Sequence, residues 1–137
     1  MSYLAAYAGA MLVFLGLDAI WLTIMSNRLY RSVLGDMLAE RFNATAAIAF
    51  YLVYGLGMVV LAIAPALREM SGSRAALNGA ILGLVAYATY DLTNQATLRI
   101  WSTRLTLADI AWGAALTAMA AYAGFNAARL VARVSGA

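Results

Sequence analysis

The fold is decided by residues 3–25, YLAAYAGAMLVFLGLDAIWLTIM, in which Asp18 is the only charged residue. A helix needs about 20 predominantly apolar residues to cross the ~30 Å hydrocarbon core of a bilayer, and this stretch is long enough. Three more apolar stretches follow, from about Ala44 to Leu67, from about Arg74 to Leu98 and from about Leu105 to Leu130. The pattern predicts an all-α polytopic membrane protein, a bundle of four transmembrane helices.

The composition agrees with this class. Hydrophobic residues make up 65% of the 137 positions, and charged residues make up only 11%. Soluble domains are closer to 45–50% apolar and about 25% charged, so a soluble chain of this kind would expose large apolar patches. No shift in composition marks a second domain, and we therefore expect one four-span domain over residues 1–137.

Three residue types are absent from the sequence, and their absence excludes several kinds of chemistry. The chain has no cysteine, no histidine and no lysine. Disulfides, the usual zinc and haem ligands, and Schiff-base cofactors are therefore not expected. We expect no cofactor and no metal site.

The net charge of +3 is carried by nine arginines that are spread over the loops and chain ends. Scattered arginines beside apolar spans indicate contact with membrane lipid headgroups, and no basic patch indicates nucleic acid. An even number of spans places both termini on one side of the membrane. The loops on one side hold five arginines and the other side holds four, so the positive-inside rule does not choose an orientation.

Local signals predict where the helices begin and end. Residues 28–41 mix arginine and acidic residues with leucines, which is typical of a short amphipathic helix at the interface. Pro65 is expected to end or bend the second span. The predicted N-terminal caps are Asn43 or Thr45 for the second span, Ser73 for the third, and Thr106 with Asp109 for the fourth.

Three aspartates fall within or at the rim of the spans, namely Asp18, Asp91 and Asp109. A carboxylate at membrane depth is costly and therefore marks a candidate functional site. Asp18 and Asp91 each come late in spans that run in the same direction, and Asp109 comes early in the span that returns. We therefore expect the three carboxylates at one depth, near one leaflet, facing the interior of the bundle.

Aromatic and polar residues accompany these aspartates. Trp21 follows Asp18 by three residues, as Trp112 follows Asp109, and this spacing places each pair on one helix face. The third span has an unusually polar second half, which contains Tyr87, Tyr90, Asp91, Asn94 and Gln95.

Structural explanations exist for each of these residues. Tryptophans near span ends commonly form an interfacial belt, and Asp109 suits the first turn of a helix. Asp18 or Asp91 could pair with Arg99, with Arg104 or with a facing hydroxyl. Gly79 with Gly83 form a GxxxG spacing that favours close helix packing.

Three strings carry a family resemblance: DAIWL at 18–22, YATYDLTN at 87–94, and Trp101 followed by DIAWG at 109–113. They resemble a small bacterial membrane-protein family catalogued as domain of unknown function 2177, over nearly the whole chain. The resemblance implies four spans and a multi-pass position in the bacterial inner (cytoplasmic) membrane. It implies no particular activity.

The leading hypothesis is a polar pocket between spans one, three and four that binds a lipid or another apolar small molecule. Asp91 and Asp18 would be its proton-exchanging groups, and Arg99 or Arg104 would attract an anionic head. The other expected binding residues are Asp109, Asn94, Tyr87, Tyr90, Trp21 and Trp112.

Three classes of function remain open from the sequence. The pocket would suit an intramembrane enzyme, or a small proton-coupled carrier that acts as a homo-oligomer. Alternatively, the chain is an accessory or assembly subunit of a larger membrane complex, and the same residues contact a partner.

Overall fold

The computed structural model describes residues 1–35, 38, 41 and 43–136, and among these it contains helices and no strand. Four helices are long and apolar enough to cross a membrane, which confirms the predicted fold class. They cover Ser2–Leu34, Ala44–Arg68, Gly72–Thr97 and Thr103–Val134. The first begins as α1 (Ser2–Met25), the second as α3 (Ala44–Gly57), and the last two are α5 (Gly72–Thr97) and α6 (Thr103–Val134).

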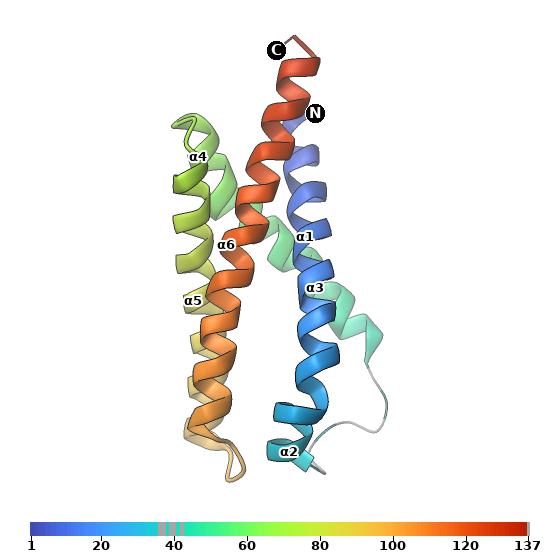
Figure 1. The fold of residues 1–137 in the computed structure, drawn as a ribbon, viewed down its shortest axis with the longest axis vertical. Helices are drawn as coiled ribbons and strands as arrows, with labels where there is room; N and C mark the ends of the chain where they lie inside the picture. The colour runs from blue at the N-terminus through green and yellow to red at the C-terminus, as the bar shows by residue number, and fades with distance from the viewer. Residues whose placement is uncertain (36–37, 39–40, 42, 137) are drawn as a thin grey trace.

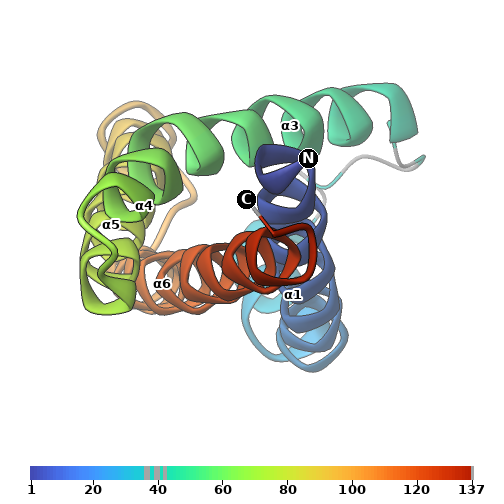
Figure 2. The ribbon, with the colours of Figure 1, turned by 90° about the horizontal axis from the view of Figure 1, so that it is seen from above.

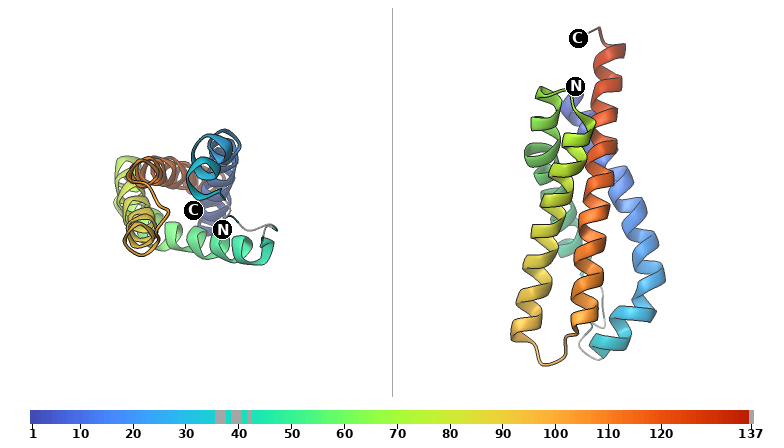
Figure 3. Two further views of the ribbon diagram at one scale, coloured as in Figure 1. Left: turned by 90° about the horizontal axis from the view of Figure 1, so that it is seen from below. Right: turned by 60° about the vertical axis from the view of Figure 1, so that its left-hand side comes forward.

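Both termini lie at one end of the bundle, as predicted, and the turn between α5 and α6 lies at the other (Figure 1; Figure 3, right). Helix α6 packs between α1 and α5. The second span runs obliquely behind these three helices, and the view along the bundle shows it crossing one side (Figure 2). This tilt brings α3 across the space between α1 and α5.

The first span does not end at Met25. Helix α1 passes into the wider turn η1 (Ser26–Tyr30), in which the N–H of Arg31 donates to the carbonyl of Ser26, five residues earlier. The chain continues as α2 (Arg31–Leu34) and then reaches Gly35, whose φ of +47° favours glycine. The short amphipathic helix predicted for residues 28–41 is therefore helical over residues 28–34, but it continues the first span and is not a separate element. Residues 36–37 and 39–40 of the predicted segment lie outside the described residues.

The second span also contains a wider turn. Helix α3 leads into η3 (Met58–Ile63), where the N–H of Ala64 donates to the carbonyl of Val59, and then into α4 (Ala64–Arg68). Pro65 has no N–H and cannot continue a regular helix from the preceding turn. Pro65 was predicted to end or bend the span in its last turn. The helix does not end at Pro65 but continues for three more residues to Arg68, and the irregular wider turn lies directly before the proline.

Each of the three later spans begins at a side-chain cap. Asn43 accepts the N–H of Ala46 at 3.1 Å, which confirms one of the two residues predicted for α3. The other two predictions are wrong, because the caps come earlier in the chain. Ser71 accepts from Arg74 at 3.2 Å and Ser102 accepts from Leu105 at 3.1 Å.

Small residues let α5 and α6 approach closely. A Cβ atom on Gly79 would lie 2.6 Å from the Thr117 carbonyl oxygen, and one on Gly83 would overlap the backbone of Gly113. The predicted packing role of the GxxxG spacing is confirmed. Helices α1 and α6 meet in the same way, since a Cβ atom on Gly124 would lie 2.6 Å from the Ala6 carbonyl oxygen.

Replacing Gly83 by alanine is expected to lower the free energy of unfolding by about 1–3 kcal/mol, because the added methyl group meets backbone that cannot rotate away. Gly16→Ala is the matched control, since no atom lies within 4 Å of its added Cβ, and it should change stability by less than about 0.5 kcal/mol. Unfolding in mixed detergent micelles with increasing dodecyl sulfate measures both. Equal stabilities for the two variants would contradict this packing.

Candidate functional site

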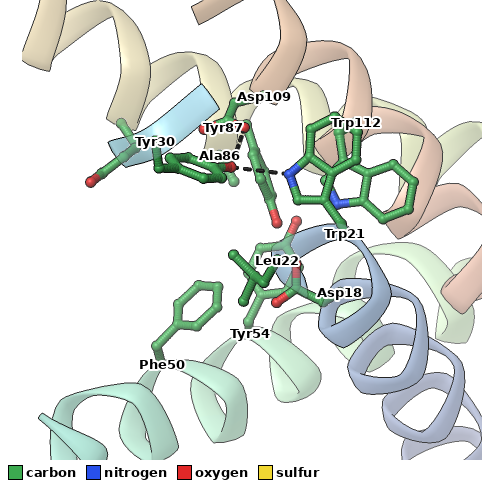
Figure 4. Close-up of a pocket in the computed structure, with 11 residues that line it drawn as sticks. Asp18, Trp21, Leu22, Tyr30, Phe50, Tyr54, Ala86, Tyr87, Asp109 and Trp112 are labelled. Atoms are coloured by element: carbon green, nitrogen blue, oxygen red, sulfur yellow. Dashed lines mark hydrogen bonds between the residues drawn. The ribbon is translucent and has the colours of Figure 1, made fainter. Parts of the chain in front are cut away.

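A cavity of about 360 Å³ opens between all four spans (Figure 4). The lining residues are Asp18, Trp21 and Leu22 of α1, Tyr30 of η1, Phe50 and Tyr54 of α3, Ala86, Tyr87 and Tyr90 of α5, and Asp109 and Trp112 of α6. The expectation of a pocket between spans one, three and four was incomplete. The second span adds a wall to the cavity because its tilt carries Phe50 and Tyr54 to it.

All three membrane aspartates are inside the protein. Asp18 is 8% exposed, Asp109 is 4% exposed and Asp91 is fully buried. Asp18 and Asp109 line the cavity, whereas Asp91 is absent from its wall. The cavity therefore carries two carboxylates among side chains that are otherwise aromatic or aliphatic.

Asp109 is held by a short chain of hydrogen bonds. The hydroxyl of Tyr30 donates to Asp109 Oδ1, and the indole N–H of Trp21 donates to the Tyr30 oxygen at 3.0 Å. Trp21 also stacks on Trp112, with ring centroids 4.6 Å apart and planes 5° from parallel (Figure 4). The two Asp–Trp pairs noted in the sequence thus meet face to face across α1 and α6.

Asp18 has a separate partner on the second span. The hydroxyl of Tyr51 donates to Asp18 Oδ2 at 2.8 Å, and the Tyr51 ring packs edge-on against Phe14. One turn further along α3, the Tyr54 hydroxyl lies 2.9 Å from Thr117 Oγ1. The site therefore depends on Tyr30 and Tyr51, two residues that no pattern in the sequence singles out.

The position of Asp91 follows from the pairing of α5 with α6. Gly83 contacts Gly113, and further down the pair Thr106 donates to Gln95 Oε1 at 2.7 Å. Asp91 lies between these two contacts on α5, at the level of Asp109 on α6. Neither carboxylate oxygen of Asp91 has a hydrogen-bond partner among the described residues, and the buried indole nitrogen of Trp112 also lacks one.

The expectation that Arg99 or Arg104 pairs with an aspartate is wrong. Both arginines are exposed and neither lines the cavity, and within the described part of the chain the only ion pair joins Arg74 to Glu69. Asn94 is half-buried and also lies outside the cavity wall. The turn before α6 is instead fixed by neutral groups, with Gln95 donating to Thr103 at 2.9 Å and Trp101 donating to Thr106 at 3.0 Å.

This geometry suits recognition of an apolar molecule that also has a polar group. Aromatic rings offer flat apolar faces, and carboxylates accept hydrogen bonds or attract positive charge. Each tyrosine hydrogen bond engages one oxygen of its carboxylate, Oδ1 in Asp109 and Oδ2 in Asp18. The carboxylates are thus fixed in direction by the protein.

Comparison with known proteins gives a family. No curated protein and no solved structure matches the chain. A family model described as a predicted membrane protein (DUF2177) matches residues 3–126, which include every residue of the cavity wall. The chain therefore belongs to the DUF2177 family of predicted membrane proteins.

Proposed function

We propose that this membrane protein binds a lipid or another apolar small molecule in the cavity between its four spans. The observation that carries the proposal is a cavity of about 360 Å³ in which aromatic side chains surround two buried carboxylates. Ligand pockets typically measure about 300–1,000 Å³ and combine an apolar lining with a few fixed polar groups. This cavity matches both properties.

The volume limits the ligand to a small molecule or to one part of a lipid. The stacked pair of Trp21 and Trp112 gives one flat wall, and the rings of Tyr54 and Tyr87 lie on other sides of the same space. A flat or ring-shaped apolar group would bury most of its surface here. The carboxylates would then select for a group that donates hydrogen bonds or carries positive charge.

Fixed acceptors reduce the entropy lost when a ligand binds. Tyr51 orients Asp18 and Tyr30 orients Asp109, while Trp21 in turn orients Tyr30. A ligand hydroxyl or amine would therefore meet carboxylates that are already in place.

Proton exchange is a second part of the proposal, and Asp91 supports it. A buried carboxylate that has no hydrogen-bond partner is very costly as an ion and far less costly as a neutral acid. Asp91 is fully buried, both its oxygens lack partners among the described residues, and it lies at the level of Asp109. We propose that Asp91 exchanges a proton when the cavity fills.

Filling the cavity tests the binding function. The probe is 1-aminoanthracene, a flat apolar amine whose fluorescence rises in apolar cavities, added to the protein in phosphatidylcholine nanodiscs. Ala86 lines the cavity, and Ala86→Phe should weaken the saturable part of the signal at least about tenfold, the equivalent of ~1.4 kcal/mol. Ala111 is exposed on α6, so Ala111→Phe is the matched control and should bind as the unmodified protein does.

Two results would count against a binding cavity. One is a wild-type signal that rises without saturation, as it does for partition into lipid alone. The other is equal saturable binding by wild type and Ala86→Phe.

A further inference from the structure

We infer that the ligand class of this cavity is a lipophilic cation, a molecule in which an ammonium or similar positive group is attached to an apolar body. The inference rests on the proposed binding function and goes beyond it, because a binding cavity alone does not specify charge. Three observations carry it: the two acidic side chains in the wall, the aromatic rings around them, and the position of the arginines.

The wall contains two acidic side chains and no basic side chain. Asp18 and Asp109 both line the cavity and are at least nine-tenths buried, and no arginine is among the lining residues. The sequence contains no lysine or histidine that could take an arginine's place. Buried carboxylates are normally paired with a cation, and a cationic ligand would supply that pair from outside the protein.

The aromatic rings favour the same ligand. Cations are attracted to the faces of aromatic rings within about 6 Å of the centroid, and cages of such rings are the known recognition sites for quaternary ammonium groups. Seven of the eleven lining residues are tryptophan, tyrosine or phenylalanine, and they come from all four spans. A neutral apolar ligand would use these rings for burial only and would leave the carboxylates unbalanced.

The arginine positions argue against an anionic ligand. Arg99 and Arg104 are exposed on or beside the turn before α6 and form no ion pair with Asp18 or Asp109. An anionic headgroup inside the cavity would therefore meet two carboxylates and no cation. This reverses the expectation that an arginine attracts an anionic head into the pocket.

The test uses three probes of nearly one shape and three charges: benzyltrimethylammonium, neutral neopentylbenzene, and anionic phenylmethanesulfonate. Each displaces 1-aminoanthracene from the full chain in phosphatidylcholine nanodiscs, which have no net lipid charge. Concentrations are expressed as mole fractions in the bilayer, because neopentylbenzene partitions strongly into lipid. The cation should displace the dye at a mole fraction at least about 30-fold lower than the neutral probe, and the anion should not displace it.

The outcomes separate this inference from the proposed function. Equal displacement by the cation and the neutral probe would overturn the cation preference and leave the binding function standing. Displacement by the anion alone would have the same two consequences. Saturable dye binding that none of the three probes displaces would also overturn the cation preference. Absence of saturable dye binding would overturn both. In Ala86→Phe, the cation should show no displacement beyond that from the lipid background.

Discussion

Replacing Asp18 and Asp109 together by asparagine is expected to weaken benzyltrimethylammonium binding by at least about 100-fold. Two unit charges 4 Å apart attract each other by about 4 kcal/mol at an effective dielectric constant of 20, and 100-fold corresponds to only about 2.7 kcal/mol. Asparagine keeps the shape and an acceptor oxygen, so Tyr51 and Tyr30 retain hydrogen-bond partners. The loss should therefore come from the charge.

The displacement titration in nanodiscs measures this effect, with 1-aminoanthracene as the internal control. Dye binding should stay within about threefold of wild type, because the dye is neutral. Glu69→Gln removes one negative charge from the exposed ion pair with Arg74, away from the cavity, and should leave cation binding unchanged. A double asparagine variant that binds the cation normally would show that the carboxylates do not recognise it.

Replacing Asp91 by leucine is expected to raise the free energy of unfolding by about 1–3 kcal/mol. A buried polar group without a partner costs about this much, and leucine has the same branching with apolar atoms in place of the oxygens. Asp18→Leu is the contrasting variant, since it leaves the Tyr51 hydroxyl without its acceptor and should lower stability by about 1–3 kcal/mol. Unfolding by dodecyl sulfate in mixed micelles measures both variants. Lower stability for Asp91→Leu would mean that Asp91 has a stabilising partner.

The proton role of Asp91 is tested by the gentler change to asparagine. Asp91→Asn should keep the protein inserted and folded, yet a pH indicator in weakly buffered solution should no longer register proton release when benzyltrimethylammonium binds. Wild-type protein should release protons in the same experiment. Equal proton release from both would remove Asp91 from this role.

The spans could be predicted because membrane insertion depends on local composition and length. Four apolar stretches separated by short polar breaks leave little choice of architecture. Most of the observed helix ends lie within a few residues of the predicted ones. The exact first residue of a helix was harder to predict, since Ser71 and Ser73 are both residue types that suit an N-terminal cap of α5. The choice between them depends on backbone geometry.

The aspartates were found from the sequence because an ionisable residue inside a span stands out by its cost alone. Their partners could not be found in this way. Tyr30, the last residue of the wider turn Ser26–Tyr30, reaches Asp109, and Tyr51 reaches Asp18 because the second span is tilted. Neither feature has a signal in hydropathy or spacing.

Two arginines were predicted at the site but lie outside it. Arg99 and Arg104 are close in sequence to the polar half of α5, and an ion pair was the simplest way to compensate a buried carboxylate. In the structure, Trp101 and Gln95 donate hydrogen bonds to threonine side chains and so stabilise the turn, and both arginines remain exposed. Proximity in sequence therefore did not indicate proximity in space.

The most direct test of a binding cavity between the spans is to locate a bound probe. Crystals of the protein grown with (4-bromobenzyl)trimethylammonium would be measured at the bromine absorption edge. We expect an anomalous bromine peak inside the cavity, beside the stacked rings of Trp21 and Trp112 and near Tyr54 and Tyr87, with the ammonium group toward Asp18 or Asp109. A cavity with no bromine peak, in crystals whose bromine lies only along the outer faces of the helices, would contradict it.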